Sequence, residues 1–148
     1  MRSFPIAFAA LAACGAAHAQ QDCNTTSGKC KVDVLVFGTC PTTNIRFDPD
    51  TLRLAGRHNV EIVWSLPQGY AFCPGRNDGV KFKDASGNPD GQFYDPVYDD
   101  ASGTCFLHFK WHNKNEPWTA QRPAYAYIVQ FTSPTATTCT KDPFIKNG

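Results

Sequence analysis

The sequence predicts an all-β fold, an antiparallel two-sheet β-sandwich stabilised by disulfides. Apolar residues alternate with polar ones at a period of two, turn-forming residues separate these segments, and no segment shows helical periodicity. About seven or eight short segments each carry one apolar face, which two sheets bury by packing face to face. Strands do not alternate with helices, so a doubly wound parallel sheet is excluded.

Each expected strand is defined by its alternating apolar side chains. In chain order these are Val32, Val34 and Val36; Ile45 and Phe47; Leu52 and Leu54; Val60, Ile62 and Trp64; Val80 and Phe82; Leu107, Phe109 and Trp111; and Tyr125, Tyr127, Val129 and Phe131. Turn formers lie between them, at Asp48-Pro49-Asp50, Leu66-Pro67-Gln68-Gly69, Cys73-Pro74-Gly75 and Asn77-Asp78-Gly79.

Residues 84–103 depart from this pattern, because they are rich in aspartate, glycine and proline. We expect a long acidic excursion between strands, and long loops on a rigid scaffold often carry function. Phe93, Tyr94, Tyr98 and Trp118 are the candidate binding surface, since Tyr and Trp are favoured where a surface binds a partner. The alternative is that these aromatics fill the inter-sheet core or cover its ends.

The N-terminus has the form of an export signal. An apolar run, Phe4–Ala13, is followed by Ala17-His18-Ala19, which fits an A-x-A cleavage site. We therefore assign 1–19 to a signal peptide and 20–148 to a single β-sandwich domain. The alternative is a lipoprotein anchored through Cys14, whose surroundings resemble a lipobox. Either way the folded part is expected to be secreted or periplasmic.

Charge and composition exclude several function classes. Loss of Arg2 with the signal leaves one basic residue fewer than the 14 in the chain, matching the 13 acidic residues. Nucleic-acid binding is not expected of a neutral chain without clustered Lys and Arg. After the signal, no apolar run approaches the roughly 20 residues of a spanning helix. The 11 Phe, 5 Tyr and 3 Trp argue against disorder.

Six of the seven cysteines remain after cleavage. They are Cys23, Cys30, Cys40, Cys73, Cys105 and Cys139. An even set in an exported chain favours a disulfide framework over a metal site, and no C-x-x-C pair occurs. Six cysteines allow about 15 pairings. We favour a local Cys23–Cys30 bond, Cys73–Cys105 across the middle, and Cys40–Cys139 joining the two ends.

One stretch carries a family resemblance. Ile45–Pro49 reads apolar-x-Phe-x-Pro, and Gly56–Trp64 reads Gly-x-x-x-Val-x-Ile-x-Trp. This resembles the opening of cupredoxins and of other Greek-key sandwiches, including immunoglobulin-like domains. The cupredoxin resemblance implies a copper site of two His, one Cys and usually an axial Met. Cys105 and His108 imitate part of that motif, but Met1 leaves with the signal.

Other candidate sites are incomplete. His108 and His112 lie on one face of a strand, roughly 13 Å apart at ~3.3 Å per residue, too far to chelate one ion. Residues 84–95 show alternate oxygen ligands like an EF-hand loop, yet the sixth position is Pro89 and the twelfth is Asp95, which favours a solvated loop. No Gly-x-Ser-x-Gly elbow is present.

These observations predict an exported, non-enzymatic protein without a cofactor. Its role is binding or structural, at the cell envelope or outside the cell, with a protein or a glycan as partner. Two alternatives remain open: a periplasmic copper-binding, cupredoxin-like protein, and a small secreted hydrolase. The ligand, the oligomeric state and ion binding by 84–103 are not specified by the sequence.

Overall fold

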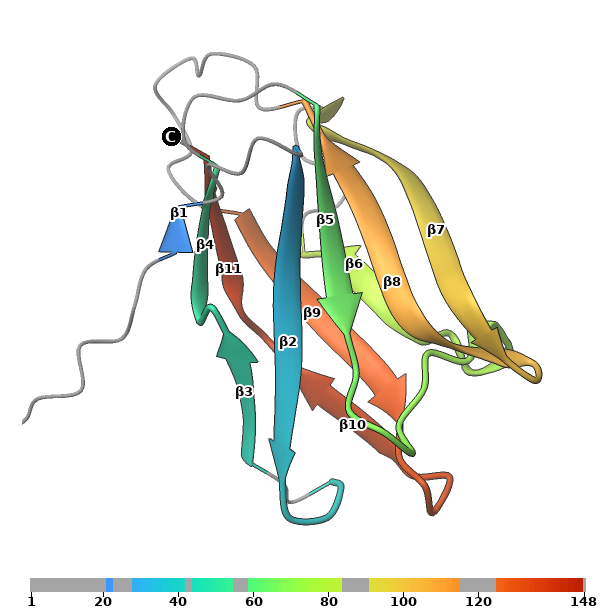
Figure 1. The fold of residues 1–148 in the computed structure, drawn as a ribbon. Coiled ribbons are helices and arrows are strands. Elements are labelled where there is room, and N and C mark those ends of the chain that lie inside the picture. The colour runs from blue at the N-terminus through green and yellow to red at the C-terminus, as the bar shows by residue number, and fades with distance from the viewer. Residues whose placement is uncertain are drawn as a thin grey trace, which may run out of the picture.

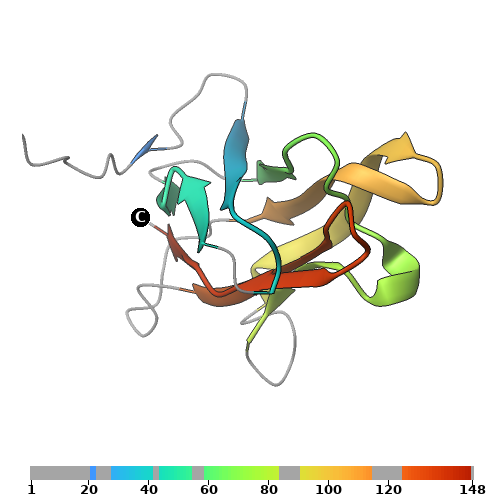
Figure 2. The same cartoon turned by 90° about the horizontal axis from the view of Figure 1, so that it is seen from below.

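A computed structural model describes residues 21–22, 28–41, 44–54, 59–83, 91–114 and 125–147. Two sheets pack face to face, and the predicted β-sandwich is confirmed. Figure 1 shows β2 and β5 in front of β9, and Figure 2 shows the same strands as separate layers seen from below. The predicted signal peptide and Cys14 lie outside the described residues.

The first sheet has five strands in the order β3-β2-β5-β8-β7. Their bounds are β2 Lys29–Phe37, β3 Asn44–Asp48, β5 Val60–Ser65, β7 Phe93–Ser102 and β8 Cys105–Asn113. The pairs β2·β3, β5·β8 and β7·β8 are antiparallel, as predicted, whereas β2 and β5 run parallel. The central strand, β5, is thus held by one parallel and one antiparallel neighbour.

The second sheet has six strands, ordered β1-β4-β11-β9-β10 with β6 also paired to β9. Their bounds are β1 Gln21–Asp22, β4 Thr51–Leu54, β6 Gly79–Phe82, β9 Tyr125–Thr132, β10 Thr138–Lys141 and β11 Phe144–Asn147. β10 and β11 both pair with β9 in the antiparallel direction, and the register of the pairing does not change between them. Pro143 interrupts them because it has no N–H, but its carbonyl accepts from the Tyr127 N–H at 3.2 Å.

The chain passes from one sheet to the other between β3 and β4. Only Pro49 and Asp50 separate these strands, and the Pro49 ring is buried. β3 pairs with β2 in the first sheet, whereas β4 pairs in parallel with β11 in the second. The alternating apolar residues on both sides of the corner therefore line the same core.

The predicted alternation also gives the core. Every predicted strand contributes inward side chains to the core; most of these are buried, Val36, Leu107 and Trp111 are partly buried, and the largest fully buried one is Trp64 near the end of β5. Its ring meets the Tyr127 ring of β9 edge-on, with centroids 5.5 Å apart, and its Nε1–H donates to the Tyr127 hydroxyl at 3.3 Å. Burial raises the pKa of the Tyr127 hydroxyl well above its usual value.

A buried carboxylate holds the segment that leaves β5. Asp78 is 1% exposed and follows the short 3-10 helix η1, Pro74–Arg76. Its Oδ2 accepts from the Cys73 N–H at 3.0 Å and from the Thr132 hydroxyl at 2.7 Å. The carboxylate thereby joins the turn before β6 to the end of β9.

The predicted disulfide framework is present. Cys40–Cys139 joins residues 99 apart in sequence, and Cys73–Cys105 joins residues 32 apart. Cys30 is also disulfide-bonded, and its predicted partner, Cys23, lies outside the described residues. In the chain-entropy model the longer loop stabilises the fold by up to about 4.7 kcal/mol and the shorter by about 3.7 kcal/mol.

The expectation that 84–103 forms a long excursion is wrong for its second half. β7 covers Phe93–Ser102 and pairs with β8 in an antiparallel hairpin. Register shifts between Tyr94 and Val97, where Asp95 has a φ of 57°. This bulge places one extra residue in β7, so Pro96 needs no partner in the ladder. Residues 84–90 lie outside the described residues.

We expect Tyr127→Phe to change the response of the fold to alkali. Because the folded pKa is raised above 10.0, Tyr127 stabilises the wild type fully below pH 10, and this contribution is lost as pH rises further. At pH 7 the variant should lose about 1 kcal/mol, since the Trp64 N–H loses its acceptor. Urea unfolding between pH 7 and 11 measures both effects. If the free energy of unfolding falls equally with pH in the wild type and the variant, Tyr127 is not the group responsible.

We expect Asp78→Ala to lower the free energy of unfolding by about 2–4 kcal/mol, because two buried donors lose their acceptor. Asp142→Ala is the control, since Asp142 is half-exposed and pairs only with Lys83 at 2.7 Å among the contacts described; its loss should stay below about 1 kcal/mol. Urea titration followed by Trp fluorescence compares the two. Similar losses would show that Asp78 does not hold the turn.

Candidate functional site

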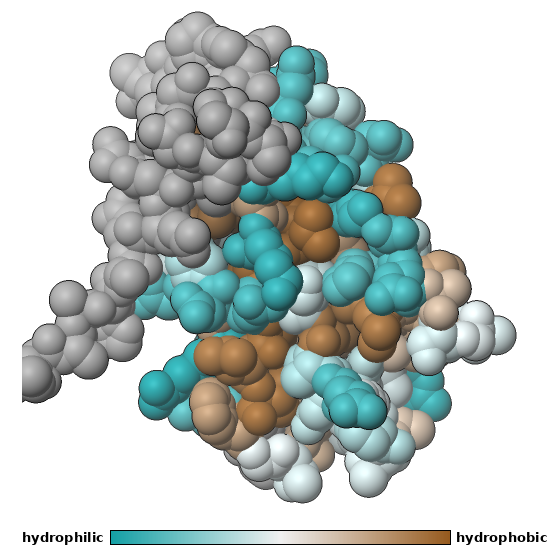
Figure 3. Space-filling model, viewed as in Figure 1, coloured by the Kyte–Doolittle hydropathy of each residue, from teal (hydrophilic) through white to brown (hydrophobic). Residues whose placement is uncertain are grey.

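The five-stranded sheet carries an unusual set of polar side chains on the side away from the core, here called the outer face. Cross-strand pairing arranges its central part in three rows: Lys29, Glu61, His112 and Tyr94; Lys31, Val63, Lys110 and Val97; and Asp33, Ser65, His108 and Asp99. Figure 3 views this side, with hydrophilic residues over its upper part and apolar ones over the lower ends of β2 and β3.

The first row is an ionic chain in which Glu61 is the central group. Its side chain is only 17% exposed, with Oε1 at 3.1 Å from Lys29 Nζ and Oε2 at 3.6 Å from His112 Nε2. The Tyr94 ring stacks on the His112 imidazole with centroids 5.3 Å apart. Asp95, in the β7 bulge, lies 3.9 Å from His112 Nδ1. The imidazole is thus placed between two carboxylates and against a ring.

The other two rows are joined at β7 and β8. Lys110 Nζ pairs with the Asp99 carboxylate. The hydrogen bond from Lys110, followed by one from the backbone of Asp100, lowers the pKa of Asp99, and the same pair raises the pKa of Lys110. The His108 Nδ1 lies 3.9 Å from Asp100 Oδ2. The carboxylates of Asp99 and Asp100 in β7 therefore face Lys110 and His108 of β8 across the hairpin.

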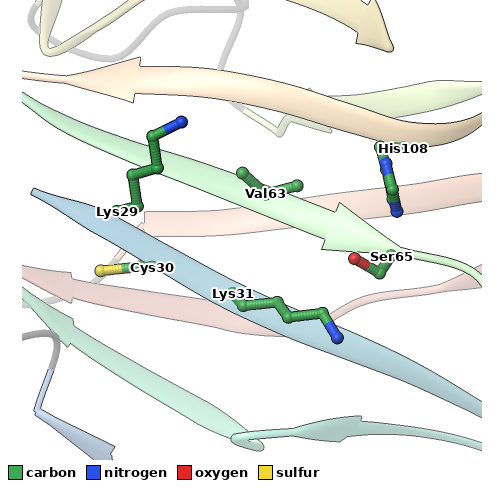
Figure 4. Close-up of a pocket in the computed structure, with 6 residues that line it drawn as sticks. All are labelled: Lys29, Cys30, Lys31, Val63, Ser65 and His108. Carbon is green, nitrogen blue, oxygen red and sulfur yellow. The ribbon is translucent and has the colours of Figure 1, made fainter. Parts of the chain in front are cut away.

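A hollow of about 250 Å³ opens in this face above β5. It is lined by Lys29, Cys30, Lys31, Val63, Ser65 and His108 (Figure 4). The short side chains of Val63 and Ser65 leave the space, with the lysines of β2 on one side and His108 of β8 on the other. Among the described residues, no carboxylate lines it.

Ser65 is the unusual group in the hollow. The residue is 8% exposed, and its hydroxyl oxygen is enclosed and has no hydrogen-bond partner in the described part of the chain. A buried hydroxyl without a partner costs about 1–3 kcal/mol, so most buried hydroxyls have one. The hydroxyl therefore remains available to a bound group.

The four predicted surface aromatics are not brought together. Phe93 is fully buried and stacks on Phe82, with centroids 3.7 Å apart. Tyr98 points inward and donates to the Asp78 carbonyl at 2.6 Å; burial, with the Asp78 charge second, raises its pKa. Tyr94 is on the outer face, and Trp118 lies outside the described residues. A binding role for these residues stays a prediction.

The structure limits the metal-site alternatives. Cys105 is bonded to Cys73, so it cannot supply the thiolate of a copper site. Within the described ranges, no group of three or more His, Cys, Asp or Glu residues could hold a metal ion. The oxygen ligands expected before residue 91 lie outside those ranges, while Asp95 belongs to β7 and faces His112. No helix in the described part of the chain could span a membrane.

Sequence reasoning missed the groups that line the hollow. Lys31 and Ser65 are outward members of predicted strands, and outward polar residues usually face solvent alone. Lys29 precedes the alternation that predicted its strand, although β2 begins there. The available signal was the alternation itself, which places Ser65 and His108 on outward faces. It did not show that β2 and β8 flank β5.

Comparison with known proteins finds no matching family model, no matching curated protein and no matching solved structure.

We expect Glu61→Gln to lower the free energy of unfolding by about 1–2 kcal/mol at neutral pH, because a carboxylate that is only 17% exposed loses its charge beside Lys29 and its contact with His112. Asp33→Asn is the matched control: Asp33 pairs with Lys31 at 2.8 Å but is 45% exposed, so its loss should stay near or below about 0.5 kcal/mol. Urea unfolding at low ionic strength measures both. Equal effects would mean that the Glu61 chain is an ordinary surface ion pair.

Proposed function

We propose that the protein is a non-enzymatic binding protein that acts outside the cytoplasm, with the outer face as its contact surface. The hollow above β5 carries this proposal. It combines two ammonium groups, an imidazole and an enclosed hydroxyl without a partner. Convergent polar groups in a concave site are typical of ligand recognition.

The disulfides support the proposed location. Cys40–Cys139 and Cys73–Cys105 persist only where the surroundings are oxidising. The apolar N-terminal run and Ala17-His18-Ala19 provide the matching export signal. A secreted or periplasmic fate, with lipidation at Cys14 as the alternative, is part of the proposal.

Binding is favoured over hydrolysis by the state of the hydroxyl. Ser65, His108 and Asp100 come from three adjacent strands and superficially follow the order of a catalytic triad. A triad, however, needs the hydroxyl hydrogen-bonded to the base. The Ser65 oxygen makes no hydrogen bond to any described group, including His108, which supports binding over hydrolysis.

The fold supports a binding role in a second way. The order of the strands, with β3 and β4 divided between the two sheets, is compatible with a Greek-key sandwich, and we place the domain with cupredoxin-like or immunoglobulin-like sandwiches on the resemblance of Ile45–Pro49 and Gly56–Trp64. Such scaffolds present their surfaces rigidly. A protein or glycan partner would carry the bound group to the hollow.

Amide chemical-shift mapping tests the proposal. The exported full chain, kept oxidised, is titrated with acetate, inorganic sulfate, inorganic phosphate, glucose and N-acetylglucosamine. We expect at least one probe to shift amides of β2, β5 and β8 around the hollow, while the six-stranded sheet stays unchanged.

Two results would overturn the proposal. One is the absence of any shift around the hollow with every probe. The other is release of nitrophenol from p-nitrophenyl acetate that Ser65→Ala abolishes, because this would identify a hydrolase. A disulfide-preserved fold, checked by intact mass before and after reduction, is the control for both measurements.

A further inference from the structure

We infer that the hollow recognises a tetrahedral oxyanion, namely the sulfate or phosphate monoester of a small organic group. This inference rests on the proposed binding function and specifies the ligand of the same site. It follows from the kind of polar groups that line the hollow, from their directions and from its size.

The lining offers donors. Lys29 and Lys31 contribute ammonium groups that can only donate, and the Ser65 hydroxyl can donate. No carboxylate lines the hollow among the described residues. A ligand rich in acceptors fits such a lining, whereas a cation or an amine would meet the two ammonium groups.

The ion pairs around the hollow leave the donors accessible. Lys31 pairs with Asp33 at 2.8 Å, and Lys29 pairs with Glu61 at 3.1 Å. Both lysine side chains are nearly two-thirds exposed, at 65% and 64%. Both partners of the Lys31–Asp33 pair are exposed, so this pair contributes little and the flexible Lys31 stem can turn its ammonium group toward a ligand at small cost. The Lys29 ammonium group stays paired with the mostly buried Glu61 and adds positive charge beside the hollow.

Ser65 is the observation that points to a ligand independently of the charges. Its hydroxyl is enclosed and without a partner at the base of the hollow. In Figure 4 its oxygen points along β5 toward the side of Val63. An oxyanion that reaches this hydroxyl would accept its hydrogen bond.

The arrangement of the donors favours a tetrahedral group over a planar carboxylate. Lys31, Ser65 and His108 belong to β2, β5 and β8, so they approach the hollow from two sides and from below. Planar carboxylates are recognised best by the flat fork of arginine, and no arginine lines the hollow in the described chain. The oxygens of sulfate or phosphate point in four directions and match donors from several strands.

The size of the hollow limits the ligand. Its volume of about 250 Å³ lies just below the ~300–1,000 Å³ of pockets that hold drug-sized molecules. An inorganic ion alone would leave much of it filled with water. A monoester about the size of a monosaccharide would contact the apolar side chain of Val63 as well as the lysines of β2.

Calorimetric titration of the oxidised full chain at low salt tests the inference. The probes are inorganic sulfate, inorganic phosphate, glucose 6-sulfate, glucose 6-phosphate, acetate and glucose. We expect one ester or both to bind at least about tenfold more tightly than acetate or glucose, the tenfold corresponding to one charge-assisted contact. The two esters distinguish sulfate from phosphate chemistry. Binding should weaken as ionic strength rises.

Three variants locate the site. Lys31→Gln should weaken binding of the ester about tenfold, through loss of one charge-assisted contact. Lys83→Gln is the matched control, since it makes the same charge change on the other sheet, where Lys83 pairs with Asp142; it should leave affinity unchanged. Ser65→Ala should also weaken binding, while its urea midpoint stays equal to wild type or rises.

The outcomes separate this inference from the proposed function. Equal losses in Lys31→Gln and Lys83→Gln would show a general charge effect and overturn the oxyanion site. Tight binding of glucose, with shifts around the hollow and no preference for the esters, would overturn the oxyanion inference but keep the binding function. A lowered urea midpoint in Ser65→Ala would assign its hydroxyl a structural role and likewise overturn it.

Discussion

The contact between Trp64 and Tyr127 determines how the two sheets face each other. Both residues lie on central strands, β5 and β9, and their edge-on rings and shared hydrogen bond join the layers at the middle of the core. Because successive side chains in a strand point to opposite sides, burying Trp64 places Val63 and Ser65 on the outer face. The same contact that closes the core therefore positions the base of the hollow.

The sequence predicted the faces of the strands but not their neighbours. Period-two alternation correctly assigned Trp64 inward and His108 outward, since burial of one face determines the orientation of the whole strand. The order of strands depends on contacts between distant segments. The parallel pairing of β2 with β5 brings Lys31 beside Val63. No pattern of residues in either segment predicts this pairing. The site was therefore only half predictable.

The bulge in β7 explains why Tyr94 and Tyr98 lie on different faces of the sheet. In an uninterrupted strand Tyr94 and Tyr98 would share a face, as residues of equal parity do. One extra residue between Tyr94 and Val97 reverses the parity, so Tyr98 turns inward and reaches the Asp78 carbonyl. Aspartate and proline are uncommon in strands, so residues 93–102 did not have the composition of one. They form a strand because their backbone pairs with that of β8. By contrast, parity and compartment predicted that the cysteines form disulfides. The favoured pairs Cys40–Cys139 and Cys73–Cys105 are confirmed, but the choice among the possible pairings depends on the fold.

The pairing of β11 has a consequence for the timing of assembly. It lies between β4 and β9, and Cys139 in the strand just before it is bonded to Cys40. A chain that is made from its N-terminal end has β4 ready long before its parallel neighbour exists. Until β11 follows, β4 keeps an unsatisfied edge, and such long-range closure is slow. The sandwich therefore closes only after the last strand of the domain has been made.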